Sequence, residues 1–472
     1  MAKKTSTPVL TVAGLQPQLL AALRAWHTGD VPAAGPLTAL LLVRARQAAL
    51  AGADGSANRR RALNEVLLAG LDELLTTDPR GAQVLRLRYL DAQLTKQVAH
   101  RLNASVDQVN RLQRAALRGL AELLLRQELQ LRDQRAAELE AALPPPACQR
   151  LVGFDGAGTA LEGQLLKPDA PWLVQITGLG GIGKTALADM VARRVIRHFH
   201  FDRVLWVRAA PADQALPPSE AYDQLLLALA AVGVPDLTSS PAGRLARLRQ
   251  LLKEQPHLVI FDNLEAEALT AYCLEHLPAL AAPSKFLLTS RARSVLASAY
   301  NWSPPELDLG EAEALIRDQA ALAGPDLAGA LTSADTQAIF RVVGGNPLAL
   351  KLVVGLLVVQ PLAEVLRDLE QARAGAAEDL YRHIYWRAWR SLSVEARALL
   401  QAMPLVAEVG AAPAQLHAIS GLTEAQLWPA VMELWTRSLL EARGTPRDKR
   451  YGIHRLTETF LRTEIIHWAE VG

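Results

Sequence analysis

The pattern of apolar and polar positions divides the chain into helical and mixed regions. From about residue 15 to 142, Leu, Ala and Arg dominate and apolar residues recur every three or four positions, which predicts helices without strands. Between about 150 and 300, short apolar runs alternate with amphipathic segments, as in a parallel α/β sheet. Beyond 305 the helical period returns. We expect strands at residues 173–176, 203–207, 258–261 and 285–289, and a late hairpin from 438–442 and 450–453.

These changes of pattern predict a multidomain protein of α and α/β parts. A charged helix ends near Leu143, and three prolines at 144–146 form a stiff spacer after it. Helices followed by one hairpin at the end of the chain are typical of a winged helix. The expected parts are an all-α region at 1–143, an α/β domain with a parallel sheet at 144–304, a small helical domain at 305–378 and a winged-helix domain at 379–472.

Composition and charge exclude several classes of protein. The 50 Lys and Arg residues against 48 Asp and Glu give a net charge of +2, which excludes a uniformly basic nucleic-acid coat protein. The two cysteines, Cys148 and Cys273, cannot build a disulfide framework and fit a reducing setting. The apolar run 352–359 is far shorter than the ~20 residues of a membrane helix, and no signal peptide is evident. We therefore expect a cytoplasmic protein that makes no membrane contact.

A glycine-rich loop between a predicted strand and a predicted helix is the strongest candidate for chemistry. Residues 178–185 read Gly-Leu-Gly-Gly-Ile-Gly-Lys-Thr and match the P-loop pattern G-x-x-x-x-G-K-[ST], with a helix expected at 186–198. The glycines let backbone N–H groups turn toward a phosphate, and the helix N-terminus adds positive potential. Lys184 would neutralise phosphate oxygens, and the Thr185 hydroxyl would coordinate Mg²⁺. The expected phosphate-binding residues are Gly178, Gly180, Gly181, Ile182, Gly183, Lys184, Thr185 and Ala186.

Two further strand ends supply candidate polar groups. Asp262 follows an apolar run and would hold the Mg²⁺ ion together with Thr185, mostly through water. Asn263 stands where many hydrolytic relatives carry a second acid, and Glu265 is the alternative acid; because an amide cannot accept a proton from water, we expect slow hydrolysis. Arg291 offers a fork of donors to a γ-phosphate. The candidate catalytic residues are Lys184, Asp262 and Arg291, with simple helix caps as the alternative for the last two.

Six segments occur in the order found in NB-ARC proteins, at 151–155, 178–185, 261–263, 288–291, 345–350 and 451–454. Over about 150–470 the chain therefore resembles this family of STAND-class signalling NTPases, which includes apoptotic scaffolds and plant immune receptors. The resemblance implies a nucleotide switch, in which the small helical domain and the winged helix close over ADP. It also implies that exchange for ATP opens the chain and lets copies assemble.

The resemblance assigns contacts to the nucleotide. In the family, the segment that matches 151–153 lies along the adenine, which makes Val152 and Gly153 candidates. Pro347 would pack near the base from the helical domain. His454 would reach the β-phosphate from the winged helix, and its alternative is an ordinary histidine on a hairpin strand.

The sequence departs from the family pattern at two positions. Phe154 replaces the usual Arg, so any polar contact from that position is lost. Arg455 replaces the acid that often follows the histidine. Relatives usually continue into a repeat-built sensor, whereas this sequence ends at Gly472, so either the chain is truncated or it senses its trigger differently.

The N-terminal region contains a predicted helix-turn-helix at about 70–125. A short helix, a turn at 103–104 and a longer helix have its spacing, with Thr95 and Ser105 as expected N-caps. On the second helix, apolar residues share one face and basic residues take the opposite one. The run resembles the promoter-contacting C-terminal helix-turn-helix of sigma factors. That resemblance predicts DNA contacts from Lys96, Asn110, Arg111, Arg114 and Arg118.

Three functions remain open on the sequence alone. The first is a nucleotide-gated regulator of bacterial type that exposes its helix-turn-helix to DNA. Residues 59–126 support it, because they carry twelve Lys and Arg against seven Asp and Glu. The second is an immune-type or death-type signalling scaffold whose N-terminal bundle recruits an effector protein, since a basic outer face also suits a protein partner or solvent. The third is a turnover ATPase.

Overall fold

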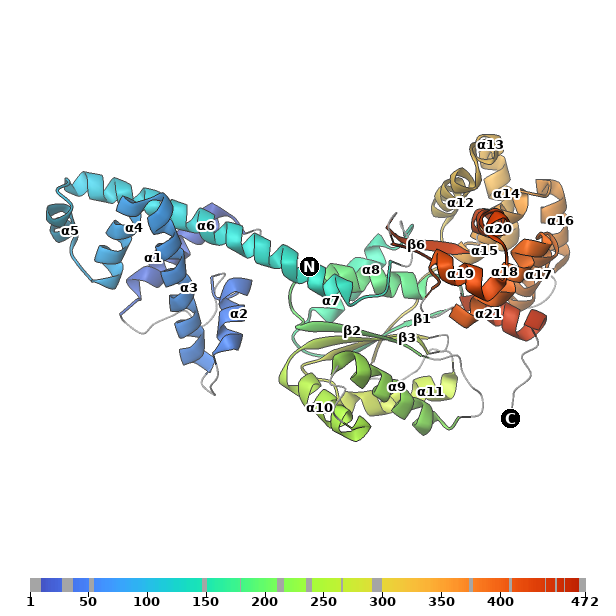
Figure 1. Cartoon of the computed structure of the whole chain (residues 1–472), viewed down its shortest axis with the longest axis horizontal. Helices are drawn as coiled ribbons and strands as arrows, with labels where there is room; N and C mark the ends of the chain where they lie inside the picture. Colours follow the sequence, from blue (N-terminus) through green and yellow to red (C-terminus); the bar gives the residue numbers. More distant parts are fainter. Residues whose placement is uncertain are drawn as a thin grey trace. The chain divides into compact units, whose positions relative to one another are not determined.

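The structure is a computed structural model of the chain (Figure 1). It describes residues 10–27, 37–50, 55–146, 151–178, 180–209, 216–234, 240–264, 266–290, 299–372, 377–406, 410–437, 439–445, 448–453 and 455–466. The chain divides into two compact units, residues 1–140 with 197–199, and residues 141–196 with 200–472. Each unit is described by itself.

The described part of the first unit is helical, as the three- and four-residue spacing predicts. Leucines of its long helices meet in one apolar core, in which Leu19, Leu67 and Leu120 are fully buried. The Glu128 carboxylate is also buried and accepts hydrogen bonds from the Leu41 and Leu42 amides. The elements are α1 (Val12–Arg24), α2 (Leu41–Ala49), α3 (Gly55–Thr77), α4 (Pro79–Leu85), a π-helical turn (Arg86–Leu90), α5 (Thr95–Arg101) and α6 (Val106–Ala141).

Helices α4, α5 and the start of α6 share a second small core. The residues that form it are Val84, Leu87, Val98, Ala99 and Val109. The turn between α5 and α6 passes through Asn103 with φ of +47°, a left-handed conformation that Asn tolerates better than most residues. The helix–turn–helix order expected from the sequence is therefore present, while its likeness to sigma factors remains a prediction.

The capping prediction for this motif is half right. The Ser105 hydroxyl accepts the Gln108 amide at 3.1 Å, as expected of an N-cap. The prediction for Thr95 is wrong, because α5 begins at Thr95 itself and its N-cap is Leu94. The Gln97 side chain accepts the Leu94 amide at 2.7 Å, which satisfies that donor without a Thr hydroxyl.

The second unit contains a parallel sheet of five strands in the order β2-β3-β4-β1-β5. Four strands lie where the apolar runs predict them: β1 (Leu173–Thr177), β2 (Arg203–Arg208), β3 (His257–Leu264) and β4 (Lys285–Ser290). The fifth, β5 (Ala299–Trp302), was not predicted, because its residues are only half-buried at the sheet edge and form no apolar run. The sheet confirms the α/β class, and β1 lies inside it, next to β4 and β5.

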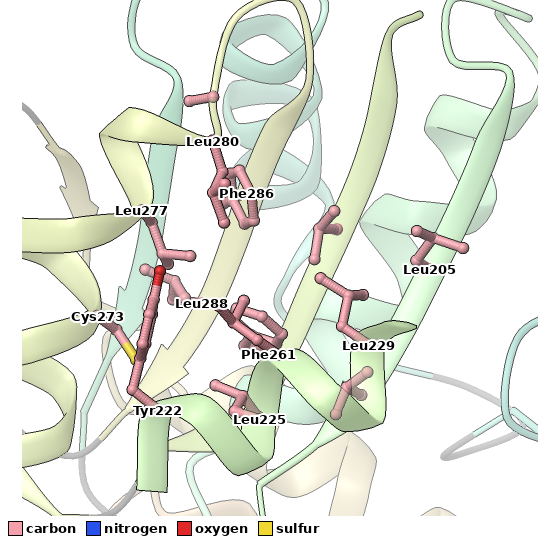
Figure 2. Packing of buried hydrophobic residues seen from close by; sticks show 14 of the residues in the cluster. Leu205, Tyr222, Leu225, Leu229, Phe261, Cys273, Leu277, Leu280, Phe286 and Leu288 are labelled. Atoms are coloured by element: carbon pink, nitrogen blue, oxygen red, sulfur yellow. The ribbon is translucent and has the colours of Figure 1, made fainter. Parts of the chain in front are cut away.

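Helices cover both faces of the sheet (Figure 1). α7 (Asp155–Leu165) and α8 (Lys184–Ile196) lie on one face, and α9 (Pro218–Gly233), α10 (Pro241–Glu254) and α11 (Glu267–His276) on the other. Figure 2 shows the second interface, where Phe261 and Phe286 of the sheet pack against Leu225 and Leu229 of α9. Cys273 lies in this core as a free thiol whose pKa burial raises to about 12; Cys148 lies outside the described residues.

The chain beyond the sheet is mainly helical. The expected hairpin is present a few residues away from its predicted bounds, as antiparallel β6 (Glu441–Thr445) and β7 (Asp448–Gly452). Helices precede this hairpin, but its assignment to a winged helix remains a prediction. No helix among the described residues is long and apolar enough to cross a membrane. The helices are α12 (Leu309–Ala323), α13 (Pro325–Ala330), α14 (Ser333–Val343), α15 (Pro347–Leu357), α16 (Leu362–Ala372), α17 (Ala377–Arg390), α18 (Val394–Ala402), α19 (Pro413–Ser420), α20 (Glu424–Thr436) and α21 (Arg455–Phe460).

Candidate functional site

The glycine-rich loop leaves the carboxyl end of β1 and leads directly into α8. Gly181 and Gly183 have φ of +77° and +99°, conformations that residues with a Cβ rarely adopt. The loop therefore depends on glycine at these positions. Lys184 is the first residue of α8, and its ammonium group donates to the Gly178 carbonyl at 2.8 Å, which folds the side chain back over the loop.

Asp262 joins three elements at the carboxyl edge of the sheet. Its carboxylate oxygen Oδ1 accepts hydrogen bonds from the Thr185 hydroxyl at 2.8 Å and from the Thr289 hydroxyl at 2.7 Å. Asp262 and Thr289 are each only 1% exposed, so this network is sheltered from water. The structure thus brings together Thr185 and Asp262, the two residues expected to hold the metal.

Asn263 occupies a bulge of β3. The register between β3 and β4 shifts between Phe261 and Leu264, and Asn263 has φ of +71°. Its backbone amide donates to the Thr289 hydroxyl at 2.7 Å. Asn tolerates this left-handed conformation, which is a structural reason for its presence that the sequence pattern did not reveal.

The segment before α7 lies close to both the loop and α12. Phe154, where the resemblance to NB-ARC proteins predicts an Arg, is buried with its ring 3.3 Å from the position a Cβ would take on Gly183. Gly153 has φ of +81°, and a Cβ there would come within 2.8 Å of Leu307 and Glu311. The apolar ring of Phe154 therefore supports the loop by packing, and Val152 beside Gly153 is half-buried.

Asn346 connects the helical region to the glycine-rich loop. Its side-chain Nδ2 donates to the Gly180 carbonyl at 3.1 Å, and its Oδ1 accepts the amides of Leu348 and Ala349 at the start of α15. Asn346 is completely buried, and Pro347 follows it as the first residue of α15. Sequence reasoning selected Pro347 and missed Asn346, because a contact between positions 166 residues apart leaves no local pattern.

For the remaining predicted site residues, the structure either gives no position or shows only that they are exposed. Arg291, Glu265 and His454 lie outside the described residues. The residues expected to contact DNA are all exposed on α5 and α6: Lys96, Asn110, Arg111, Arg114 and Arg118. Exposed basic side chains are equally compatible with a DNA contact, a protein contact or solvent. Arg118 already forms an ion pair with Glu122 at 2.9 Å.

These residues fit a nucleoside phosphate with Mg²⁺. A loop that depends on glycine, followed by a helix N-terminus and Lys184, is a suitable site for phosphate oxygens. Thr185 and Asp262 provide hard oxygen ligands beside it. The described residues contain no group of three or more His, Cys, Asp or Glu able to hold a metal by itself. Magnesium here would therefore take its other ligands from phosphate and water, and would supply charge neutralisation at the phosphates.

Comparisons with known proteins agree with this geometry. A sequence model described as "NB-ARC domain" matches residues 155–314. "Disease resistance protein RPP8" of Arabidopsis thaliana is 29% identical over 136 residues, which cover 29% of this chain and 15% of that protein. "Disease susceptibility protein LOV1" of the same plant is 37% identical over 79 residues, covering 17% of this chain and 9% of that protein. The chain therefore matches less than a sixth of the length of these relatives.

Among solved structures, a STAND protein with a tetratricopeptide repeat sensor from Pyrococcus horikoshii is similar, with a TM-score of 0.44 and 17% identity. The match covers 67% of this chain and 43% of that chain. The matched family model begins at residue 155, so the helical N-terminal unit is outside it. The comparisons therefore place the similarity to the NB-ARC domain at residues 155–314, the part of the chain that contains the glycine-rich loop and Asp262.

Proposed function

We propose that this chain is a nucleotide-dependent signalling switch that holds ADP in a closed state and opens when ATP replaces it. NB-ARC domains bind ADP and ATP, and the glycine-rich loop, Lys184, Thr185 and Asp262 have the chemistry that such a nucleotide requires. Because Asn263 supplies no second acid, we expect hydrolysis to be slow and to reset the switch rather than to drive turnover.

The observation that carries this proposal is the contact of Asn346 with the loop. One side chain holds the N-terminus of α15 and the Gly180 carbonyl together. Leu348 adds a tight apolar contact, since a Cβ on Gly181 would lie 2.7 Å from the Leu348 Cβ. A nucleotide that changes the loop therefore changes the surface on which α15 packs, and differential affinity for two arrangements is what a ligand-driven switch needs.

We propose further that the N-terminal helical unit recruits a protein partner in signalling related to immunity. Support comes from the similarity of this chain to plant disease-resistance proteins. The first unit is compact and has its own apolar core, as a module that acts on another protein requires.

DNA contact by this unit is the second candidate function. The observation in its favour is the core shared by α4, α5 and α6, which presents Arg111, Arg114 and Arg118 on the outer face of α6. The comparisons give no support for DNA contact, because the matched family model covers residues 155–314 and lies outside this unit. We therefore rank it below recruitment of a protein.

Nucleotide retention tests the switch directly. The full chain, purified without added nucleotide and then denatured, should release ADP on chromatography, whereas Lys184→Ala should release none. Lys167→Ala is the matched control, because Lys167 is exposed and donates to Gln164 rather than to the loop. Asn346→Asp keeps the oxygen that caps α15 but turns a buried carboxylate oxygen toward the Gly180 carbonyl, so ADP release should become about tenfold faster, with a loss of stability that urea denaturation of the variant measures separately.

Three results would contradict the proposal. These are an absence of ADP from the wild type together with no measurable ADP or ATP affinity, equal release rates in wild type and Asn346→Asp, and rapid steady-state hydrolysis of ATP. The last result would favour a turnover ATPase instead.

A further inference from the structure

An arginine that the sequence patterns did not single out, Arg208, lies next to the proposed nucleotide-binding residues. Arg208 is the last residue of β2, and it pairs in register with Asp262 of β3. Register partners on parallel strands point to the same face of a sheet. Leu205 and Val207 of β2 belong to the core with α9. By alternation, Arg208 therefore faces the opposite side, the side of Asp262 and α8.

Polar groups form a row across this face at the carboxyl edge of the sheet. Arg208 is on β2, Asp262 on the neighbouring β3 and Thr289 on β4, and adjacent strands lie about 4.8 Å apart. Asp262 and Thr289 are hydrogen-bonded to each other, and Asp262 also accepts the Thr185 hydroxyl at the start of α8. The row thus runs from Arg208 to the residues that would hold the metal and the outer phosphates.

The guanidinium of Arg208 has unused hydrogen-bonding capacity. Its Nε is buried and has no hydrogen-bond partner. By contrast Arg203, at the other end of β2, donates to the Gly233 carbonyl at 3.0 Å. A buried donor without a partner lowers stability, and an anionic oxygen would satisfy it with a charge-assisted bond. Because the face is also that of the glycine-rich loop, phosphate is the anion best placed to do so.

We propose that Arg208 binds the terminal phosphate of a nucleoside triphosphate and thereby makes the site distinguish ATP from ADP. This inference rests on the nucleotide binding proposed above and adds, beside the sequence candidate Arg291, a second arginine that contacts the γ-phosphate. The loop and Lys184 hold phosphates common to both nucleotides, whereas Arg208 stands beyond Asp262 on the outer side of the row. A planar guanidinium can donate two bonds to one phosphate, and a lysine ammonium cannot reproduce that fork.

The test compares two affinities in full-length variants. Dissociation constants for ADP and for a non-hydrolysable ATP analogue, each with Mg²⁺, are measured by titration calorimetry for wild type, Arg208→Met, Arg208→Lys and Arg203→Met. Arg208→Met should weaken the analogue about tenfold or more and leave ADP within about twofold. Arg208→Lys keeps the charge and should lose about threefold for the analogue alone. Arg203→Met, the control on the same strand, should change neither affinity.

The outcomes separate the two proposals. If the wild type binds both nucleotides and the Arg208 variants lose equal affinity for both, or lose none, the role of Arg208 in reading the γ-phosphate is wrong while the switch stands. If the folded wild type binds neither nucleotide, the switch itself fails and this inference fails with it. Arg208→Lys decides the matter should Arg208→Met not fold.

Discussion

Lys285, the first residue of β4, carries a buried ammonium group. The group donates to the carbonyls of Gln164 and Asp169 at 3.0 Å each and lies 5.3 Å from the centroid of the Trp172 ring. Burial disfavours the charged form and lowers the pKa of Lys285 to about 8. In the sequence this residue only precedes an apolar run, so neither its burial nor its three contacts could be predicted.

The lowered pKa predicts a pH-dependent stability. In the unfolded chain Lys285 keeps its proton up to about pH 10.4, whereas the folded chain releases it near pH 8. Between these values the unfolded state binds more protons, so the free energy of unfolding contributed by this group rises with pH, by up to ~3 kcal/mol. Lys285→Met should lack that rise.

Chemical denaturation of wild type and Lys285→Met at several pH values from 7 to 10.5 checks this prediction. The difference between the two proteins is the quantity to follow, because the raised pKa values of Cys273 and Tyr222 act in the opposite direction and are common to both. A difference that stays constant over this range would contradict the account.

At the scale of elements, the sequence allowed prediction of those strands, loops and helices whose residues form a recognisable local pattern. Four strands are short apolar runs with polar ends, and both the P-loop and its helix follow one of them directly. β5 could not be predicted because it is a strand through its pairing with β1, whereas its own residues form no apolar run. The bulge at Asn263 and the hydrogen bond from Asn346 to Gly180 arise from contacts between distant parts of the chain. Neither the composition nor the hydrophobic periodicity of the sequence predicts such contacts.

The connection between α12 and α15 depends on a glycine that lies against backbone. Gly345 accepts the Leu307 amide at 3.0 Å and donates to Glu306 at 3.0 Å, and a Cβ on it would lie 2.1 Å from the Leu307 carbonyl oxygen. Gly345→Ala should therefore lower the free energy of unfolding by about 2–3 kcal/mol, since the backbone has to move.

Gly329→Ala is the matched control for this prediction. Gly329 lies within α13 and has no atom within 4 Å of the position of a new Cβ. Urea denaturation should show no loss of stability for this variant, because Ala favours a helix over Gly. Equal stability of Gly345→Ala and Gly329→Ala would show that the Leu307 contact is softer than the geometry implies.

At the scale of the molecule, charge and function are distributed unevenly over the chain. Residues 59–126 carry a net +5 against +2 for the whole, so the remainder sums to −3. The basic excess lies in the first unit, and the residues that match the NB-ARC domain lie in the second. The excess positive charge thus lies in the first unit, for which we propose a protein or DNA partner. Variants of these basic residues can therefore be tested separately from nucleotide binding.

A mobility shift on duplex DNA distinguishes the two proposed roles of this unit. With a protein partner as the true target, wild type and the double variant Arg111→Glu/Arg114→Glu should both leave the DNA unshifted at physiological salt, with ADP or with an ATP analogue. Lys184→Ala, which should not bind nucleotide, is the control that shows whether any shift depends on the nucleotide state. A salt-sensitive shift that the double variant abolishes would instead establish DNA contact.

Gly345 and Asn346 are neighbours in sequence and contact different parts of the second unit. Two hydrogen bonds tie Gly345 to Glu306 and Leu307, so the segments that lead into α12 and α15 are held together as one piece. Asn346 joins that piece to the loop through a hydrogen bond to the Gly180 carbonyl, and Leu348 adds a packing contact with Gly181. Ser303, just ahead of this piece, is hydrogen-bonded to Thr177 of β1 at 2.7 Å, so the chain before Glu306 is also tied to the sheet. The glycine that fixes the two helical segments is thus next in sequence to the residue that touches the loop, so a disturbance at Gly345 should reach the loop directly.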